Sequence, residues 1–425
     1  MSGGIYGGDD VGAIVFDLGS HSFRFGFGGE EYPKFDEPSV VGERVEAALG
    51  DGTMEVDKEN GASDNKRKHF LGTTEVNVPR ENGEVKKFVN DCMIEDWDLF
   101  EKMLDYAYSK CLISDSKNHG VLFSETPWNV KDKREKLAEL MFEKYQVPSF
   151  FLIKNAVLSA FSTGRHTALV LDSGATYTSA TPVYEGYPIT SAVVKSPVGG
   201  DMIVDQCRRT LAEQNIDLVP YYKVAAKTEV KDGEPPVWEA RKNLPPTTKS
   251  YEDYMEGLLL EDFAHSTLQL CETPIDVDFM EKLPASSYGF PCGFRKDFLA
   301  ERAKIPESLF DFKYLIRTRR TEKKHLLGHF KSCNHFLRYQ LYTHILAVGG
   351  NSMIMGFTER LNYELAQNVN STVKLRLPPI QPNERKYSSW IGGSIVSSLG
   401  AFQQLWIGKS EYEEMGKSIV DKRCA

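Results

Sequence analysis

The sequence predicts an α/β protein with two lobes around a central cleft, and three observations lead to this fold class. The chain has 425 residues, more than one ordinary hydrophobic core holds. A strand, a tight turn and a second strand occur twice, with the turns at Asp17-Leu18-Gly19-Ser20 and Asp172-Ser173-Gly174-Ala175. A glycine pair, Gly349-Gly350, separates a third apolar segment from a helix predicted over Met353 to Leu365.

The remaining segments can be assigned in chain order. Residues 11–40 read as strands, and residues 43–75 form a polar, glycine-containing insertion. A helix is predicted over 129–145 with Asn129 as its cap, and a second over 155–161. Five prolines and many charges indicate a surface loop over 219–249. The basic stretch 313–331 fits a solvated face, a nuclear-import signal or a phosphate-contacting patch.

The two aspartate-glycine turns carry the chemistry. A glycine in a tight turn lets backbone N–H groups approach an anion, and an aspartate at a strand end can hold a cation through water. One such turn is most simply an ordinary connection after a core strand. Two of them facing each other would clamp the phosphates and Mg²⁺ of a nucleotide.

Composition excludes several classes of protein. The net charge of −9 argues against a chain that coats nucleic acid by bulk electrostatics, although a local basic patch stays open. Seven scattered cysteines without a Cys-x-x-Cys pair favour a reducing compartment, and no cluster has zinc spacing. No signal peptide and no apolar run of bilayer length are found, so we expect a soluble intracellular protein.

The order of these sites resembles the ATPase fold shared by actin, hexokinase and the heat-shock chaperones, and the match to actin is much closer. It covers most of the chain and fades at 43–90, 219–260 and 313–345. The motifs that carry it are Ser124-Glu125-Thr126-Pro127-Trp128-Asn129, Tyr184-Glu185-Gly186-Tyr187, Arg385-Lys386-Tyr387-Ser388 and Phe402-Gln403-Gln404-Leu405-Trp406-Ile407.

The resemblance implies four subdomains. Subdomain 1 would comprise 1–38, 95–162 and 388–425, and the divergent subdomain 2, with the insertion, 39–94. Subdomain 3 would comprise 163–197 and 318–387, and subdomain 4 residues 198–317.

Within the actin family the chain is similar to nuclear actin-related subunits of the actin-like protein six type. The shared features include Met1 to Asp9, Val78-Pro79-Arg80-Glu81-Asn82 and Glu95-Asp96-Trp97-Asp98. This resemblance implies a nuclear subunit of SWI/SNF-type chromatin remodellers and related histone acetyltransferase complexes. There it would pair with actin on a helical segment of the large ATPase subunit.

The same resemblance implies an ATP site with Mg²⁺ near Asp17 and Asp172. Its expected parts are two phosphate loops, a ribose-side turn, an adenosine site and a lysine beside the base. The first phosphate loop would contain Asp17, Gly19, Ser20 and Arg24, which replaces a lysine, and the second Asp172, Ser173 and Gly174. The ribose-side turn would contain Gly199 and Asp201. The adenosine site would contain Gly349, Gly350 and Met353, and the lysine beside the base would be Lys386.

Four departures from actin point away from hydrolysis. His21 replaces a glycine whose N–H faces phosphate, and Ala175-Thr176 replaces an Asp-Gly pair. Asn155 stands in place of a water-positioning glutamine, and Ser179 in place of a histidine near that water. Losing such groups typically costs about 10²–10⁴ in rate. We therefore expect little or no ATP hydrolysis.

Three functions are compatible with this fold: a non-catalytic, nucleotide-stabilised scaffold, an active filament-forming actin ATPase, and a small-molecule kinase of the same fold. The scaffold is preferred, without homopolymer formation and without a membrane partner; direct DNA contact has weak support. An actin-like C-terminal groove would receive the partner helix, although burial in the core is the simpler expectation for Ile395 and Leu399. The groove residues would be Ile391, Ile395, Leu399, Phe402, Leu405 and Trp406.

Overall fold

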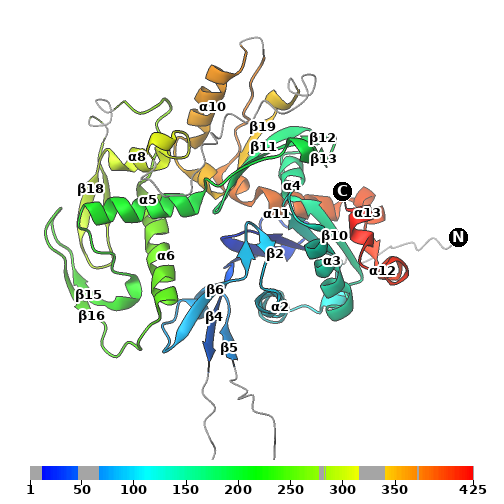
Figure 1. Ribbon diagram of the computed structural model, residues 1–425, viewed down its shortest axis with the longest axis horizontal. Helices are drawn as coiled ribbons and strands as arrows, with labels where there is room; N and C mark the ends of the chain where they lie inside the picture. Colours follow the sequence, from blue (N-terminus) through cyan, green and yellow to red (C-terminus); the bar gives the residue numbers. More distant parts are fainter. Residues whose placement is uncertain are drawn as a thin grey trace, which may run out of the picture.

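The computed structural model describes residues 12–45, 67–276, 282, 284–314, 340–370 and 373–424 (Figure 1). Two separate buried apolar clusters define two lobes, each built around its own sheet. The predicted α/β class with two lobes is confirmed. Among the described helices, none is both long and apolar enough to cross a membrane.

The first lobe contains a six-stranded mixed sheet. Its central strands β1, β9 and β10 are parallel, while β2, β3 and β20 are antiparallel to their neighbours. Phe16 on β1 stacks on Phe123 of β9, with ring centroids 4.7 Å apart, so the sheet interior is aromatic. The strands, in sheet order, are β20 (Ile407–Gly408), β10 (Ser149–Lys154), β9 (Val121–Glu125), β1 (Ile14–Leu18), β2 (Ser22–Phe27) and β3 (Phe35–Pro38).

Helices α2 (Trp97–Tyr106), α3 (Lys131–Glu139), α12 (Lys409–Met415) and α13 (Ile419–Arg423) also belong to this lobe. Asn129 does not cap α3 as predicted. The capping position is Val130, and the Asn129 amide donates to Glu125 Oε2 at 2.9 Å. The helix continues over 140–144 in π-helical form, which brings its end close to the predicted one.

The second lobe contains a five-stranded sheet. Its strands are β13 (Tyr187–Pro188), β12 (Thr178–Tyr184), β11 (Ala168–Ser173) and β19 (Ile345–Val348), with β14 (Val194–Ser196) also paired to β12. Both predicted strand–turn–strand units are therefore confirmed, as β1–β2 and β11–β12. The helices of this lobe are α5 (Gly200–Glu213), α6 (Lys249–Thr267), α8 (Glu301–Glu307) and α10 (Phe357–Asn368).

Two of the predictions for the second lobe were wrong in detail. The glycine pair is followed by a short 3₁₀ turn over Gly350–Met353, and the helix α10 begins only at Phe357. The segment 219–249 is not all loop, because β15 (Val224–Thr228) and β16 (Val237–Ala240) pair within it. A further hairpin joins β17 (Ser286–Gly289) to β18 (Arg295–Phe298). Most of the basic stretch 313–331 lies outside the described residues.

Helices α4 (Asn155–Phe161) and α11 (Pro382–Ser398) pack together between the two sheets (Figure 1). Their contact requires glycine, because a Cβ on Gly392 would lie 1.8 Å from the carbonyl oxygen of Leu158. Trp390 on α11 is fully buried and donates its Nε1–H to the carbonyl oxygen of Val15, 3.1 Å away. The two helices contact strands of both sheets and so connect the two lobes.

A small three-stranded sheet lies at one edge of the first lobe (Figure 1). It consists of β4 (Val40–Val45), β5 (Arg67–Phe70) and β6 (Gly83–Lys87), next to the short helix α1 (Thr73–Val76). A two-residue hairpin, β7 (Val89–Asn90) and β8 (Met93–Ile94), follows. The predicted insertion, 43–75, begins in β4 and ends in α1, and its residues 46–66 lie outside the described part.

Candidate functional site

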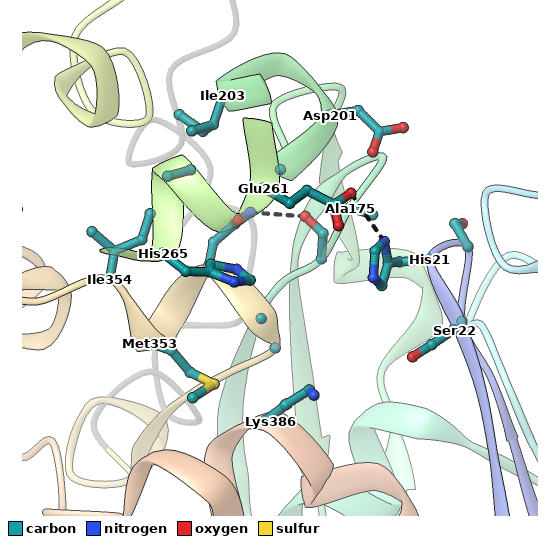
Figure 2. Close-up of a pocket in the computed structure, with 18 of the residues that line it drawn as sticks. His21, Ser22, Ala175, Asp201, Ile203, Glu261, His265, Met353, Ile354 and Lys386 are labelled. Carbon is teal, nitrogen blue, oxygen red and sulfur yellow. Dashed lines mark hydrogen bonds and ion pairs between the residues drawn. The ribbon is translucent and has the colours of Figure 1, made fainter. Parts of the chain in front are cut away.

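A cavity of about 660 Å³ lies between the lobes and contains most of the predicted nucleotide site (Figure 2). Its walls come from both aspartate-glycine turns, the glycine pair and the start of α11. The predicted residues that line it are Asp17, Gly19, Ser20, Arg24, Asp172, Gly174, Asp201, Gly349, Gly350, Met353 and Lys386. Segments more than three hundred residues apart in sequence therefore meet around one space.

The two aspartate-glycine turns share one internal hydrogen bond. The Gly19 amide donates to the carbonyl oxygen of Ser22 at 3.0 Å, and the Gly174 amide donates to that of Tyr177 at 2.9 Å. A Cβ on Gly19 would come within 2.9 Å of that Ser22 oxygen, so this turn needs glycine. The matching bonds make the two turns equivalent parts of one site.

The tips of both turns offer backbone donors to the cavity. The amides of Ser20, His21 and Ala175 form no hydrogen bond within the described part of the chain, and all three residues line the cavity. Unpaired N–H groups at a turn are a favourable environment for an anion. This arrangement fits the phosphate groups of a nucleotide.

The carboxylates of Asp17 and Asp172 face the same cavity from opposite lobes. Burial, and then the charge on Asp17, raises the pKa of Asp172 to about 6. Two carboxylates that face one space, one of them with its ionisation opposed by the other's charge, provide a suitable pair for a divalent cation. The donor set therefore fits the predicted Mg²⁺, with Asp17 and Asp172 as the residues that would hold it.

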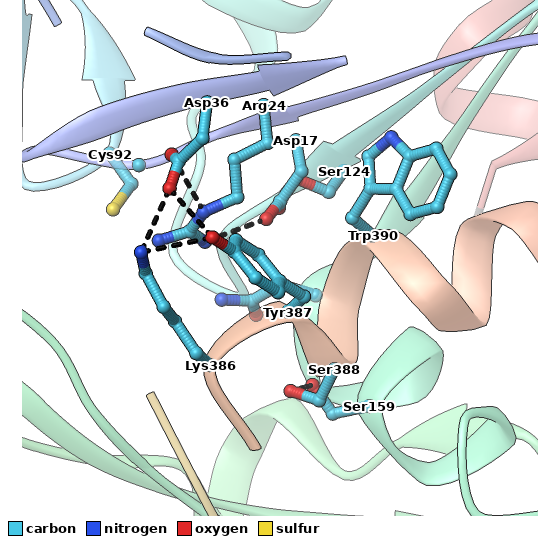
Figure 3. A network of polar contacts seen from close by, with 12 residues as sticks. Asp17, Arg24, Asp36, Cys92, Ser124, Ser159, Lys386, Tyr387, Ser388 and Trp390 are labelled. Atoms are coloured by element: carbon cyan, nitrogen blue, oxygen red, sulfur yellow. Dashed lines mark hydrogen bonds and ion pairs between the residues drawn. The ribbon is translucent and has the colours of Figure 1, made fainter. Parts of the chain in front are cut away.

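The two predicted site residues with positively charged side chains, Arg24 and Lys386, form ion pairs with carboxylates of the first lobe (Figure 3). Arg24 Nη1 lies 3.1 Å from Asp17 Oδ2, and its Nε lies 3.3 Å from Asp36 Oδ1. Lys386 Nζ lies 2.9 Å from Asp36 Oδ2, which also accepts from the Tyr387 hydroxyl at 3.1 Å. Although burial opposes it, the charge of Arg24 lowers the pKa of Asp36 to about 2. Asp36 therefore remains ionised and fixes both cations.

Two predicted residues, Ser173 and Gly199, support the cavity without lining it. The Ser173 hydroxyl is buried between Thr178 Oγ1 at 2.9 Å and Asn351 Nδ2 at 3.1 Å. Gly199 precedes α5, and a Cβ there would lie 2.3 Å from the carbonyl oxygen of Ala175. Both residues shape the second turn, and Asn351 strengthens it through a bond to the Gly174 carbonyl oxygen at 2.8 Å.

Only one of the two residues that stand in place of actin's water-orienting groups, Asn155 and Ser179, lines the cavity. Asn155 lines the cavity, but its Nδ2 donates to Asp172 Oδ2 at 3.3 Å and its Oδ1 accepts from the Ala156 amide at 2.8 Å. Ser179 is buried on β12 and is not among the cavity-lining residues.

Sequence reasoning missed the wall that α6 contributes (Figure 2). Glu261 and His265 line the cavity, and Glu261 Oε1 lies 3.5 Å from His21 Nδ1, so this pair bridges the two lobes. Burial raises the pKa of Glu261, against the opposing influence of His21 and His265. A signal was available, because Tyr251, Met255, Leu259 and Phe263 recur every four residues as on one helix face.

Comparison with known proteins decides the family. The family model described as Actin matches residues 8–425. The chain belongs to the actin family. Its actin-type fold is therefore established, and that fold binds nucleotides, which supports ATP as the ligand of the cavity.

Curated relatives of similar length carry one shared name. The chain is 36% identical to actin-related protein 4 of Arabidopsis thaliana over 447 residues, covering 99% of this chain and all of the relative. It is 35% identical to actin-related protein 4 of Oryza sativa subsp. indica with the same coverage. Against actin-related protein 4 of Yarrowia lipolytica the identity is 31%, covering 99% and 97% of the two chains.

Proposed function

We propose that this actin-family protein is a non-catalytic subunit of nuclear chromatin complexes, docked beside actin on a helical segment of a remodeller's large ATPase subunit. The finer assignment, the actin-like protein six type in SWI/SNF-type remodellers and in histone acetyltransferase complexes, comes from the sequence motifs. The likeness to proteins named actin-related protein 4 supports membership of the actin-related group. Other subunits of the complex would be further partners.

The observation that carries this proposal is an exposed apolar stripe on α11. Ile391 and Ile395 on α11 and Leu399 directly after it follow one another at four-residue spacing; Ile391 is half-buried against the core, and Ile395 and Leu399 are 38% and 46% exposed. The expectation that these two fill the core was wrong. Leu405 is 49% exposed nearby in sequence, whereas Phe402 is buried and belongs to the core. An apolar stripe of this kind suits an amphipathic helix laid along it.

ATP would have a structural role in this protein. A ligand that contacts both lobes stabilises the native state by mass action, at about 2.7 kcal/mol when its concentration is one hundred times its Kd. The free amides of the two turns and the paired carboxylates support this role. Thermal melting with and without Mg-ATP tests it, and the absence of both a shift and a co-purified nucleotide would contradict it.

Hydrolysis would be slow or absent. Asn155 is already bonded to Asp172, and Ser179 is not among the residues that line the cavity, so neither is placed to orient a water as the actin residues at these positions would. A phosphate-release assay should give a rate well below that of actin. Asn155→Gln alone should not restore turnover, because such groups act as a unit. Turnover equal to actin's would contradict this part of the proposal.

The docking proposal is tested by affinity purification from nuclear extract, followed by mass spectrometry. Ile395→Asp and Leu399→Asp should lose the large ATPase subunit, because each places a charge on the apolar stripe. Ile113→Asp is a matched control, since Ile113 is 80% exposed and outside α11. All three variants should melt close to the wild type. Retention of the ATPase subunit by both stripe variants would refute the docking surface.

A further inference from the structure

We propose that Asp36 makes the cavity select a metal-bound nucleotide over the free nucleotide, because it compensates the positive charges that free phosphates would otherwise use. This inference rests on the proposed nucleotide binding and adds the form in which the nucleotide is bound. Asp36 lies on β3 and is not among the residues that line the cavity, but it contacts two that are, Arg24 and Lys386. It would therefore be a positioning residue that acts through those two side chains.

Two of the cations that line the cavity converge on this one carboxylate (Figure 3). Arg24 Nε lies 3.3 Å from Asp36 Oδ1, and Lys386 Nζ lies 2.9 Å from Asp36 Oδ2. The Tyr387 hydroxyl accepts a hydrogen bond from Lys386 Nζ at 3.0 Å and donates one to Asp36 Oδ2 at 3.1 Å. Arg24 Nη1 also lies 3.1 Å from Asp17 Oδ2, so two carboxylates share this arginine. Asp36 is ionised at neutral pH because its pKa is about 2, so an anionic ligand would meet both cations with their charge already compensated.

The rest of the described lining adds negative charge. Besides the two aspartates assigned to Mg²⁺, it includes Asp201 and Glu261. The one other lysine or arginine in the described lining is Arg302, whose guanidinium donates to the side chain of Gln269. Gln269 pairs with Met355, so Arg302 lies beside the segment that follows the glycine pair. At the two turns a triphosphate without a metal ion would therefore meet no uncompensated lysine or arginine of the described chain, whereas a divalent cation would supply the missing positive charge.

Binding of three ligands to the nucleotide-free protein gives the test: adenosine, ATP in EDTA, and Mg-ATP, each followed by isothermal titration calorimetry. Asp36→Asn keeps the size of the side chain and removes its charge. Since the energy between two charges is proportional to each of them, the gain in affinity should grow with the charge of the ligand. We expect about tenfold tighter binding of free ATP, about threefold tighter binding of Mg-ATP, which carries about half the negative charge, and less than about a twofold change for adenosine.

Thermal melting without ligand separates this role from a structural one. Removal of the carboxylate leaves Arg24 and Lys386 with fewer partners, so nucleotide-free Asp36→Asn should melt at a lower temperature than the wild type while it binds free ATP more tightly. A purely structural role would lower both the melting temperature and the affinity. Asp36→Glu keeps the charge and should retain the wild-type ratio of the affinities for Mg-ATP and free ATP.

Glu43→Gln is the matched control. Glu43 on β4 is also a buried carboxylate between a lysine and an arginine, with Lys86 Nζ at 2.6 Å and Arg67 Nη1 at 3.2 Å, and it is not among the residues that line the cavity. The affinities of this variant for all three ligands should stay within about twofold of the wild type, because the lost charge faces two exposed cations of the small sheet and not the cavity.

The outcomes separate this inference from the proposed nucleotide binding. If the wild type binds Mg-ATP but free ATP gains no more affinity in Asp36→Asn than adenosine does, the role of Asp36 is wrong and the nucleotide site stands. Free ATP that binds the wild type as tightly as Mg-ATP overturns the inference even if no variant folds. A wild type that binds none of the three ligands overturns the proposed ATP binding and this inference together.

Discussion

Among single residues, Asp172 offers the sharpest prediction. Its pKa in the folded, nucleotide-free protein is about 6, above the ordinary value of 3.8. The folded state therefore binds a proton at the Asp172 carboxylate more tightly than the unfolded state does. The free energy of unfolding consequently falls as pH rises from about 4 to about 6. A shift of this size corresponds to at most about 3 kcal/mol at neutral pH. Asp172→Asn should raise the melting temperature at pH 7.5, by less at pH 5.5, and should weaken stabilisation by Mg-nucleotide.

The control at this scale is Asp17→Asn, which should do the opposite. Asp17 pairs with Arg24 and accepts a hydrogen bond from Ser124, so its loss should destabilise the protein by about 2 kcal/mol or more. Differential scanning calorimetry of both variants at the two pH values checks the pair. A fall in melting temperature for Asp172→Asn at pH 7.5 would show that the ionised Asp172 carboxylate does not destabilise the folded state.

Residue positions within the cavity were largely predictable, because each lies in a recognisable turn. The pairing of those residues was not. Asp36 follows no motif in the sequence, yet it fixes Arg24 and Lys386. Long-range ion pairs of this kind depend on how β3 and α11 are brought together, which local pattern does not contain.

At the scale of elements, the C-terminal helix α13 depends on one buried arginine. Arg134 on α3 lies 3.0 Å from Glu125 Oε2 and 2.6 Å from Asp421 Oδ1, and it donates to the carbonyl oxygen of Cys424. Glu125 also pairs with the buried Lys154 at 2.8 Å. Arg134→Met should cost about 3–5 kcal/mol, because it breaks buried charge pairs. Urea unfolding and limited proteolysis near the C-terminus would measure the loss.

Lys417→Met provides the comparison, since Lys417 also joins the C-terminal segment to α3, through Glu139 at 2.9 Å. Both partners are substantially exposed, at 48% and 40%. An exposed pair contributes little to stability, so Lys417→Met should lower the free energy of unfolding much less than Arg134→Met does. Equal effects of the two variants would mean that the buried network does not anchor the helix.

Helices and strands were predictable where periodicity and turn residues agree. The strands around Asp17 and Asp172 and the helix α4 follow this rule, and α4 ends before Gly164, whose φ is +69°. The hairpin β15–β16 was not anticipated, because prolines and charges suggested a loop throughout. Its strands are mostly exposed, so they lack the apolar alternation that identifies a half-buried strand.

At the scale of the whole molecule, we predict that the protein does not form homopolymers. A filament requires a complementary pair of surfaces repeated head to tail. One surface is available here, since Tyr187, Ile395 and Leu399 are all exposed. The other would be the segment that connects β4 to β5, and here that connection is long, charged and glycine-containing. A connection of this composition differs from the complementary loop that a filament contact needs.

Sedimentation at micromolar concentration in Mg²⁺ and K⁺, with ATP present, measures this directly. We expect the protein to stay in the supernatant, while actin treated in the same way pellets. An ordered pellet would favour the active filament-forming ATPase instead, and Leu399→Asp should then abolish it. If the wild type stays in solution and captures the helical segment of the ATPase subunit, the apolar stripe of α11 is free for that partner because no copy of the chain competes for it.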